Sequence, residues 1–208
     1  MQGIATFKRW LAALAAALAF AGAAEAVRAE EIEVLDARLA AIDDGIALSA
    51  DFAFDLKPRL VEAVTNGIPL YFVVEFELTR PRWYWFDEKA AAKRLQLRLS
   101  YHPLSRQYRL STGLLQQNYA TLEAALNVLR RVRSWPVLER GAVSSDATYE
   151  AAVRMRLDVT LLPKPFQLSA LTSREFNMES GWRRFAYRPA AAAPAPVESR
   201  EPRDVDTK

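Results

Sequence analysis

The stretch from residue 70 to residue 110 limits the possible folds more than any other part of the chain. Between residues 70 and 78 every second position is large and apolar, and the same alternation returns between residues 95 and 110. A period of two is the period of a β-strand, so one face of each segment is expected to meet a core and the other to meet water. The centre of the protein is therefore predicted to be β-sheet.

Turn signals divide the rest of the body into further strands. Asp43-Asp44-Gly45 separates two apolar runs, which predicts a hairpin. His102-Pro103-Leu104-Ser105 predicts a second turn, and residues 87–94 fit either a strand or a helical turn. Late strands are expected at residues 153–161 and at Phe166 and Leu168, followed by a hairpin over 176–187 with Ser180-Gly181 at its bend.

Two helices are predicted between these strands. The first begins near Pro58, because proline suits the first helical turn, and it stops at Asn66-Gly67. The second begins after Thr121, which is a suitable N-cap, and is expected to end at Trp135-Pro136. Mostly short connections between alternating strands favour antiparallel pairing. The expected fold is mainly β with two helices, an antiparallel β-sandwich; the alternative is an α+β fold, a single curved antiparallel sheet covered by helices.

The two ends of the chain have compositions unlike that of the body. Lys8 and Arg9 precede an apolar run, and Ala24-Glu25-Ala26 has the small-x-small pattern of a cleavage site, so residues 1–26 are predicted to be a cleaved signal peptide. An uncleaved N-terminal anchor is the alternative. Residues 189–208 are Pro/Ala-rich and charged and are expected to be disordered. Residues 27–188 then form a single β-rich domain, exported to the periplasm or cell envelope.

Charged side chains are expected to cover the outer faces of the strands. If the strands are neighbours, Glu and Arg pair across the sheet; alternatively, an excess of arginine forms a surface that receives lipid headgroups or an acidic protein face. The aromatic block after residue 80 is expected either to enter the core or to dock on a partner. The candidate binding residues are Arg80, Arg82, Trp83, Tyr84, Trp85, Arg98 and Arg109.

Several chemistries are poorly supported. The chain has no Cys, one His and 7 Gly, which argues against thiol catalysis, an ordinary zinc site and a Gly-rich phosphate loop. His102 has Ser100 and Ser105 nearby, but an ordinary turn residue is the favoured interpretation. Asp87-Glu88 and the pair Glu75 and Glu77 are the candidate carboxylates for a hydrolase. No catalytic residue, no metal site and no cofactor is predicted.

Three segments resemble an uncharacterised proteobacterial family, the domain of unknown function 4390 family, whose members are sometimes labelled exported proline-rich signal-peptide proteins. They are residues 80–89, residues 99–111 and Ser180-Gly181-Trp182, and the resemblance extends over most of residues 30–188. It implies an exported bacterial protein without an assigned activity. It also implies a possible link to a membrane sensor kinase system. No functional residue is transferred by the resemblance.

The expected function is a non-enzymatic binding or interaction module of the cell envelope, with a protein or an envelope component as partner. A carboxylate-dependent hydrolase and a binder of anionic membrane surfaces are the alternatives. The formal net charge of +3 is too small to indicate a nucleic-acid partner.

Overall fold

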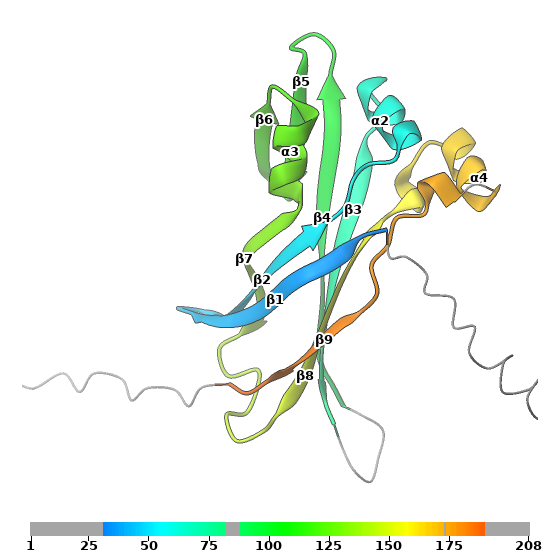
Figure 1. Cartoon of the computed structure of the whole chain (residues 1–208). Helices are drawn as coiled ribbons and strands as arrows, with labels where there is room; N and C mark the ends of the chain where they lie inside the picture. Colours follow the sequence, from blue (N-terminus) through cyan, green and yellow to red (C-terminus); the bar gives the residue numbers. More distant parts are fainter. Residues whose placement is uncertain (1–30, 82–87, 173, 190–208) are drawn as a thin grey trace, which may run out of the picture.

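Two antiparallel sheets make up most of the described chain, which comprises residues 31–81, 88–172 and 174–189 of a computed structural model (Figure 1). The small sheet has the order β1-β2-β7 and the large sheet the order β6-β5-β4-β3-β8-β9. The strands are β1 (Glu33–Ile42), β2 (Gly45–Ala53), β3 (Leu70–Arg80), β4 (Glu88–His102), β5 (Gln107–Thr112), β6 (Leu115–Tyr119), β7 (Arg131–Glu139), β8 (Tyr149–Leu157) and β9 (Arg183–Tyr187).

The alternation predicted for residues 70–110 sets the register of the large sheet. Leu70 pairs with Leu99, and Phe72 pairs with Leu97 on one side and Leu157 on the other. Phe72 and Phe76 are fully buried, because paired residues point to the same face of a sheet and this face meets the small sheet. The strands predicted at 70–78 and 95–110 are confirmed.

The small sheet begins with the hairpin predicted at Asp43-Asp44-Gly45. Ile42 pairs with Gly45, and β2 then pairs with β7, which lies some eighty residues further along the chain. The small sheet crosses over one face of the large sheet, and residues of both sheets join one hydrophobic core (Figure 1). The predicted β-sandwich-like arrangement of antiparallel sheets is confirmed.

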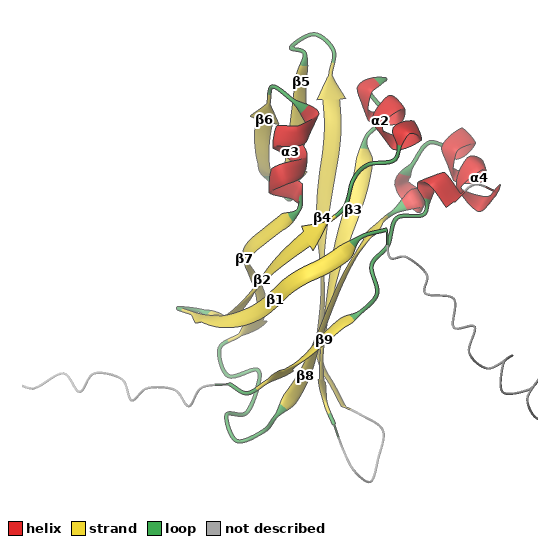
Figure 2. Ribbon diagram, viewed as in Figure 1, coloured by secondary structure: helices red, strands yellow, loops and turns green. Residues whose placement is uncertain are grey.

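The α-helices of the described residues gather toward one end of the large sheet (Figure 2). They are α2 (Pro58–Thr65), α3 (Leu122–Leu129) and α4 (Lys164–Thr172), and short 3-10 helices occupy Val159–Leu161 and Arg174–Phe176. Pro58 opens α2, and the Thr121 hydroxyl accepts a hydrogen bond from the backbone N–H of Ala124 at the start of α3, as predicted. None of the described helices combines the length and the apolar character needed to cross a membrane.

Four of the sequence predictions differ from the structure. The second helix ends at Leu129, and Trp135 and Pro136 lie inside β7, an edge strand, where a proline is tolerated. Phe166 and Leu168 belong to α4. Pro165 lies in the first turn of this helix, where a proline is tolerated. Residues 159–161 form a 3-10 helix. The last segment forms no hairpin of its own, because β9 pairs with β8.

Residues 88–94 continue β4 as a strand, and β6 was not predicted, because only its first residue is aliphatic. The signal peptide predicted at residues 1–26 lies outside the described residues, and so does the tail predicted at 189–208, apart from Pro189.

Candidate functional site

Six arginines lie on the face of the large sheet that points away from the small sheet: Arg184 on β9, which forms an ion pair with Glu150, and five others on β4, β5 and β8. In the sheet register these arginines alternate with the leucine, valine and phenylalanine residues that point to the core, so the arginines point to the other face. We call the surface formed by the five the arginine face: Arg94 and Arg98 on β4, Arg109 on β5, and Arg154 and Arg156 on β8.

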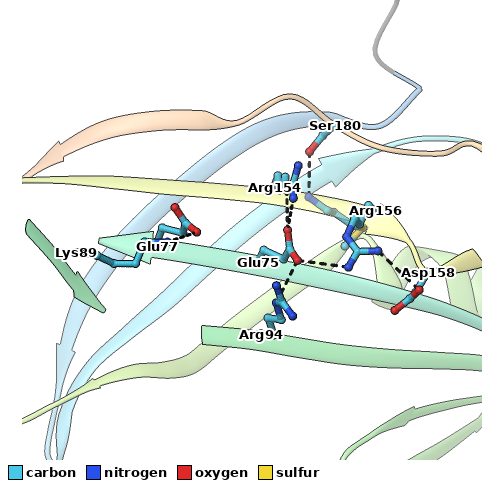
Figure 3. Close-up of polar contacts among 9 residues, drawn as sticks. Glu75, Glu77, Lys89, Arg94, Arg154, Arg156, Asp158 and Ser180 are labelled. Carbon is cyan, nitrogen blue, oxygen red and sulfur yellow. Dashed lines mark hydrogen bonds and ion pairs between the residues drawn. The ribbon is translucent and has the colours of Figure 1, made fainter. Parts of the chain in front are cut away.

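Glu75 on β3 lies at the centre of the arginine face, between two of its strands. It pairs with Arg94 on β4 and with Arg154 on β8 in the sheet register. Arg154 donates to Glu75 Oε2 at 2.6 Å from Nε, and Arg94 Nε and a terminal nitrogen of Arg156 lie 3.2 and 3.4 Å from Oε1 (Figure 3). Arg156 also lies 3.7 Å from Asp158. The cross-strand Glu–Arg pairing expected from the sequence is therefore present.

The burial of Glu75 corrects the prediction of a wet face at this point. Glu75 is only 5% exposed, although it points away from the core between the sheets. The long side chains of its arginine neighbours cover it, because β3 is flanked by strands on both sides. An edge strand would have left the same carboxylate in water.

The arginines also decide the charge state of this carboxyl group. Burial alone raises the pKa of Glu75, but the hydrogen bond from Arg154 and the positive charges of Arg154, Arg156 and Arg94 outweigh it and hold the pKa below its usual value. Glu75 is therefore a carboxylate at neutral pH. It fixes the arginines in place while leaving further guanidinium N–H donors available.

The lowered pKa of Glu75 predicts a specific pH dependence of stability. The folded protein binds this proton less readily than the unfolded chain, so the contribution is complete above pH 5 or so and is lost as the pH falls through the folded-state value. The difference in unfolding free energy between the wild type and Glu75→Gln should then shrink from pH 7 to about pH 3 in urea titrations. The other carboxyl groups titrate in both proteins, so their contributions cancel in the difference between the two unfolding free energies. A difference that grows toward acid pH would contradict this assignment.

Trp182 borders the arginine face where β8 meets the segment before β9. Its ring lies 4.5 Å from the guanidinium carbon of Arg154, a cation–π contact. Ser180 anchors this segment: its buried hydroxyl accepts a hydrogen bond from the N–H of Met155 at 2.9 Å, and its own N–H donates to the Met155 carbonyl (Figure 3). Arg154 is thus held by Glu75 and by Trp182 together.

A groove of about 440 Å³ opens beside these residues. Four cationic side chains and two acidic ones line it, so its charge favours an anionic occupant. The lining comprises Glu75, Phe76, Glu77, Lys89, Ala92, Lys93, Arg94, Arg154 and Trp182.

Arg98 and Arg109 extend the arginine face toward β5, and both were predicted as binding residues. Arg98 pairs with Ser111 and Arg109 with Ser100, so the two arginines lie diagonally on neighbouring strands. Arg98 lies over the Tyr71 ring at 5.9 Å, and Arg109 donates to Asn118 at 3.1 Å. Within the described ranges, no carboxylate forms an ion pair with either of them.

Arg80, another predicted binding residue, is not part of this cluster. Arg80 is exposed at the far end of β3, where it pairs with Glu88 in the register. Arg82, Trp83, Tyr84 and Trp85 lie outside the described residues, so the core and docking interpretations of the aromatic block both stay open.

Among the described residues, the candidate catalytic groups are not brought together into one site. His102 is the exposed last residue of β4, and its Nδ1 lies 3.3 Å from the Ser105 hydroxyl in the turn that follows. Glu77 pairs with Lys89 at 2.8 Å, and Asp87 is outside the described residues. In the part of the chain that the structure describes, no three metal-ligating side chains gather at one point.

Four residues of this surface are missing from the candidate site predicted from the sequence: Arg94, Arg154, Arg156 and Trp182. The period of two puts Arg154 and Arg156 on one strand face, but nothing in the sequence shows that β8 lies beside β3. Trp182 was noticed only as part of a resembling segment. The available signal was the shared period of two in β3, β4 and β8, with Glu in the first strand and Arg in the other two.

Comparison with known proteins gives one match. A protein-family model described as a domain of unknown function, DUF4390, matches residues 29–186, in agreement with the resemblance carried by the segments at 80–89, 99–111 and 180–182. No match was found among curated proteins or among solved structures.

Proposed function

Because the chain belongs to the DUF4390 family of domains of unknown function, we propose a function from its own surface: it is a non-enzymatic binding module whose arginine face receives an acidic surface of another protein. The observation that carries this proposal is the excess of arginine over carboxylate on one sheet face. The five arginines of the arginine face share only Glu75 and Asp158 as ion-pair partners among the described residues.

The geometry of the face supports a carboxylate-bearing partner. A guanidinium group offers N–H donors in a fixed fork that matches a carboxylate, and it keeps its charge at any physiological pH. Arg154 and Arg156 are held by Glu75, so little side-chain freedom remains to be lost when a partner binds. Arg94 is 76% exposed, and Arg98 is exposed as well, so both are accessible from solution.

The apolar run and small-residue site near the N-terminus support an envelope location, which is part of the same proposal. An acidic envelope protein, with a membrane sensor kinase system as one candidate, is then the expected partner. The hydrolase alternative relied on Asp87 and Glu88, and no feature of the described residues favours it. An anionic membrane surface shares the charge of the proposed partner and is separated from it by experiment.

The test measures binding to a synthetic poly-glutamate peptide at low salt. We expect the wild type to bind and Arg98→Glu plus Arg109→Glu to bind about 10- to 100-fold more weakly, because two attractive contacts become repulsive. The matched control is Arg131→Glu plus Arg188→Glu, which changes the net charge equally at exposed positions off the arginine face.

Each outcome of this experiment has a definite meaning. Equal weakening by both double variants would show an effect of net charge alone and would contradict a specific face. Binding to phosphatidylglycerol vesicles without binding to the peptide would replace the proposed protein partner with a lipid surface. Loss of binding at high salt is expected for exposed charges and supports the electrostatic contact.

A further inference from the structure

The two sheets have four edge strands, and three of them carry features that discourage pairing with another chain. β1 has Asp36, Arg38 and a bulge between Val34 and Asp36. β7 has Pro136, flanking arginines and two irregularities in its register, and β9 begins with Arg183 and Arg184. Charges, proline and bulges are the usual means by which proteins protect exposed sheet edges.

β6, at the edge of the large sheet, has none of these features. Its five residues, Leu-Gln-Gln-Asn-Tyr, include no charge and no proline, and its register with β5 runs without a bulge from Thr112 opposite Leu115 to Tyr108 opposite Tyr119. Leu115 is 74% exposed and the preceding turn residue Leu114 fully so. Alternate residues of this strand direct their backbone N–H and C=O groups toward the open side.

The sequence of β6 is complementary to itself when two copies run antiparallel. With a two-fold axis at Gln117, Leu115 lies opposite the partner's Tyr119, and Gln116 lies opposite the partner's Asn118. Apolar groups thus meet an aromatic ring on one face, amides meet amides on the other, and no like charges approach each other. Other antiparallel registers place leucine opposite an amide or leave residues of this short strand unpaired.

We propose that β6 pairs with β6 of a second copy, so that two large sheets join into one continuous antiparallel sheet in a two-fold dimer. The unpaired backbone N–H and C=O groups of each β6 strand form hydrogen bonds with those of the other. This two-fold contact is closed, so it creates no new sheet edge. α3 covers the core-side face of this region, so the join leaves the opposite face free (Figure 1). The two arginine faces then lie on the same side of the joined sheet.

The test uses a charge exchange at the two-fold axis. Gln117→Lys places two positive charges opposite each other in the proposed dimer, and Gln117→Glu places two negative charges there, so each variant alone should be monomeric. An equimolar mixture of the two variants should dimerise again, because opposite charges then face each other. The wild type should be dimeric in sedimentation equilibrium over a series spanning about 1 to 100 µM.

The result that overturns the proposal is a monomeric wild type at the highest concentration, or a dimer that survives in each variant alone. Failure of the mixture to reassociate would also overturn it, as would open-ended oligomers, which a closed two-fold contact does not allow. Circular dichroism and the urea midpoint of each variant show that the strand still folds. The wild-type mass is a test that needs no variant at all.

Discussion

Replacing Glu75 with alanine should lower the free energy of unfolding by about 3 kcal/mol. Glu75 is almost completely buried and holds three guanidinium groups on neighbouring strands. Its removal leaves Arg154 and Arg156, each less than one-third exposed, close together without their shared carboxylate. The loss of charged hydrogen bonds in a partly desolvated site adds to the repulsion between the arginines. Urea unfolding at pH 7 measures the difference.

Glu77→Ala is the matched control for this prediction. Glu77 lies on the same strand face, but among the described residues it forms an ion pair with Lys89 alone, and the two side chains are 35% and 54% exposed. Screening by water limits such a pair to about 0–1 kcal/mol. If both variants lost the same stability, the central position of Glu75 between two strands would have no energetic meaning.

Gly45→Ala should also cost about 3 kcal/mol, for reasons of space and backbone conformation. Gly45 begins β2 with a φ of 156°, and a Cβ atom added there would lie 2.0 Å from the carbonyl oxygen of Leu138 in β7. The obstacle is backbone and cannot rotate away, so β7 must move off β2 for alanine to fit. The loss of the β2–β7 pairing should appear as a lower urea midpoint.

Gly141→Ala separates the two causes. Gly141 has a φ of 81°, but a Cβ atom there meets nothing within 4 Å. Only the left-handed backbone conformation is then unfavourable, which costs about 1 kcal/mol. A loss at Gly141 as large as that at Gly45 would show that conformation alone, without the contact to β7, explains both.

Much of the fold was predictable because local signals agree with the final structure. The period of two in β3 and β4, the Asp-Gly turn before β2, and Thr121 before α3 each act within a few residues. Each of these predictions is confirmed.

The errors occurred where a tertiary position overrides a local signal. Trp135-Pro136 looked like a helix stop, but its position at a sheet edge allows it to continue a strand. Phe166 and Leu168 alternate like strand residues, but they follow Pro165 in the first turn of α4 and are helical. β6 lacks a regular apolar alternation, since residues on both of its faces are exposed and it ends the sheet.

The candidate site was predictable only in part. Arg98 and Arg109 were identified because their strand and its turn are local, and the structure places both on one exposed face. The cluster around Glu75 depends on which strands become neighbours. Glu75 and Arg154 lie on strands far apart in the sequence, and no local sequence signal predicts that β3 pairs with β8. Burial of a charged residue by its arginine neighbours is likewise a property of the assembled sheet.

The order in which the strands pair has a consequence for the path of folding. β2 is completed by β7, and β3 by β8, so each sheet joins segments from opposite halves of the chain. Hairpins such as β1–β2 form from neighbouring residues, whereas these two pairings require long loops to close first, which is entropically costly. A chain of this topology has a high contact order and folds on the slow, millisecond-to-second scale. When the N-terminal half of the chain is present alone, the edges of β2 and β3 that β7 and β8 later cover are still unpaired.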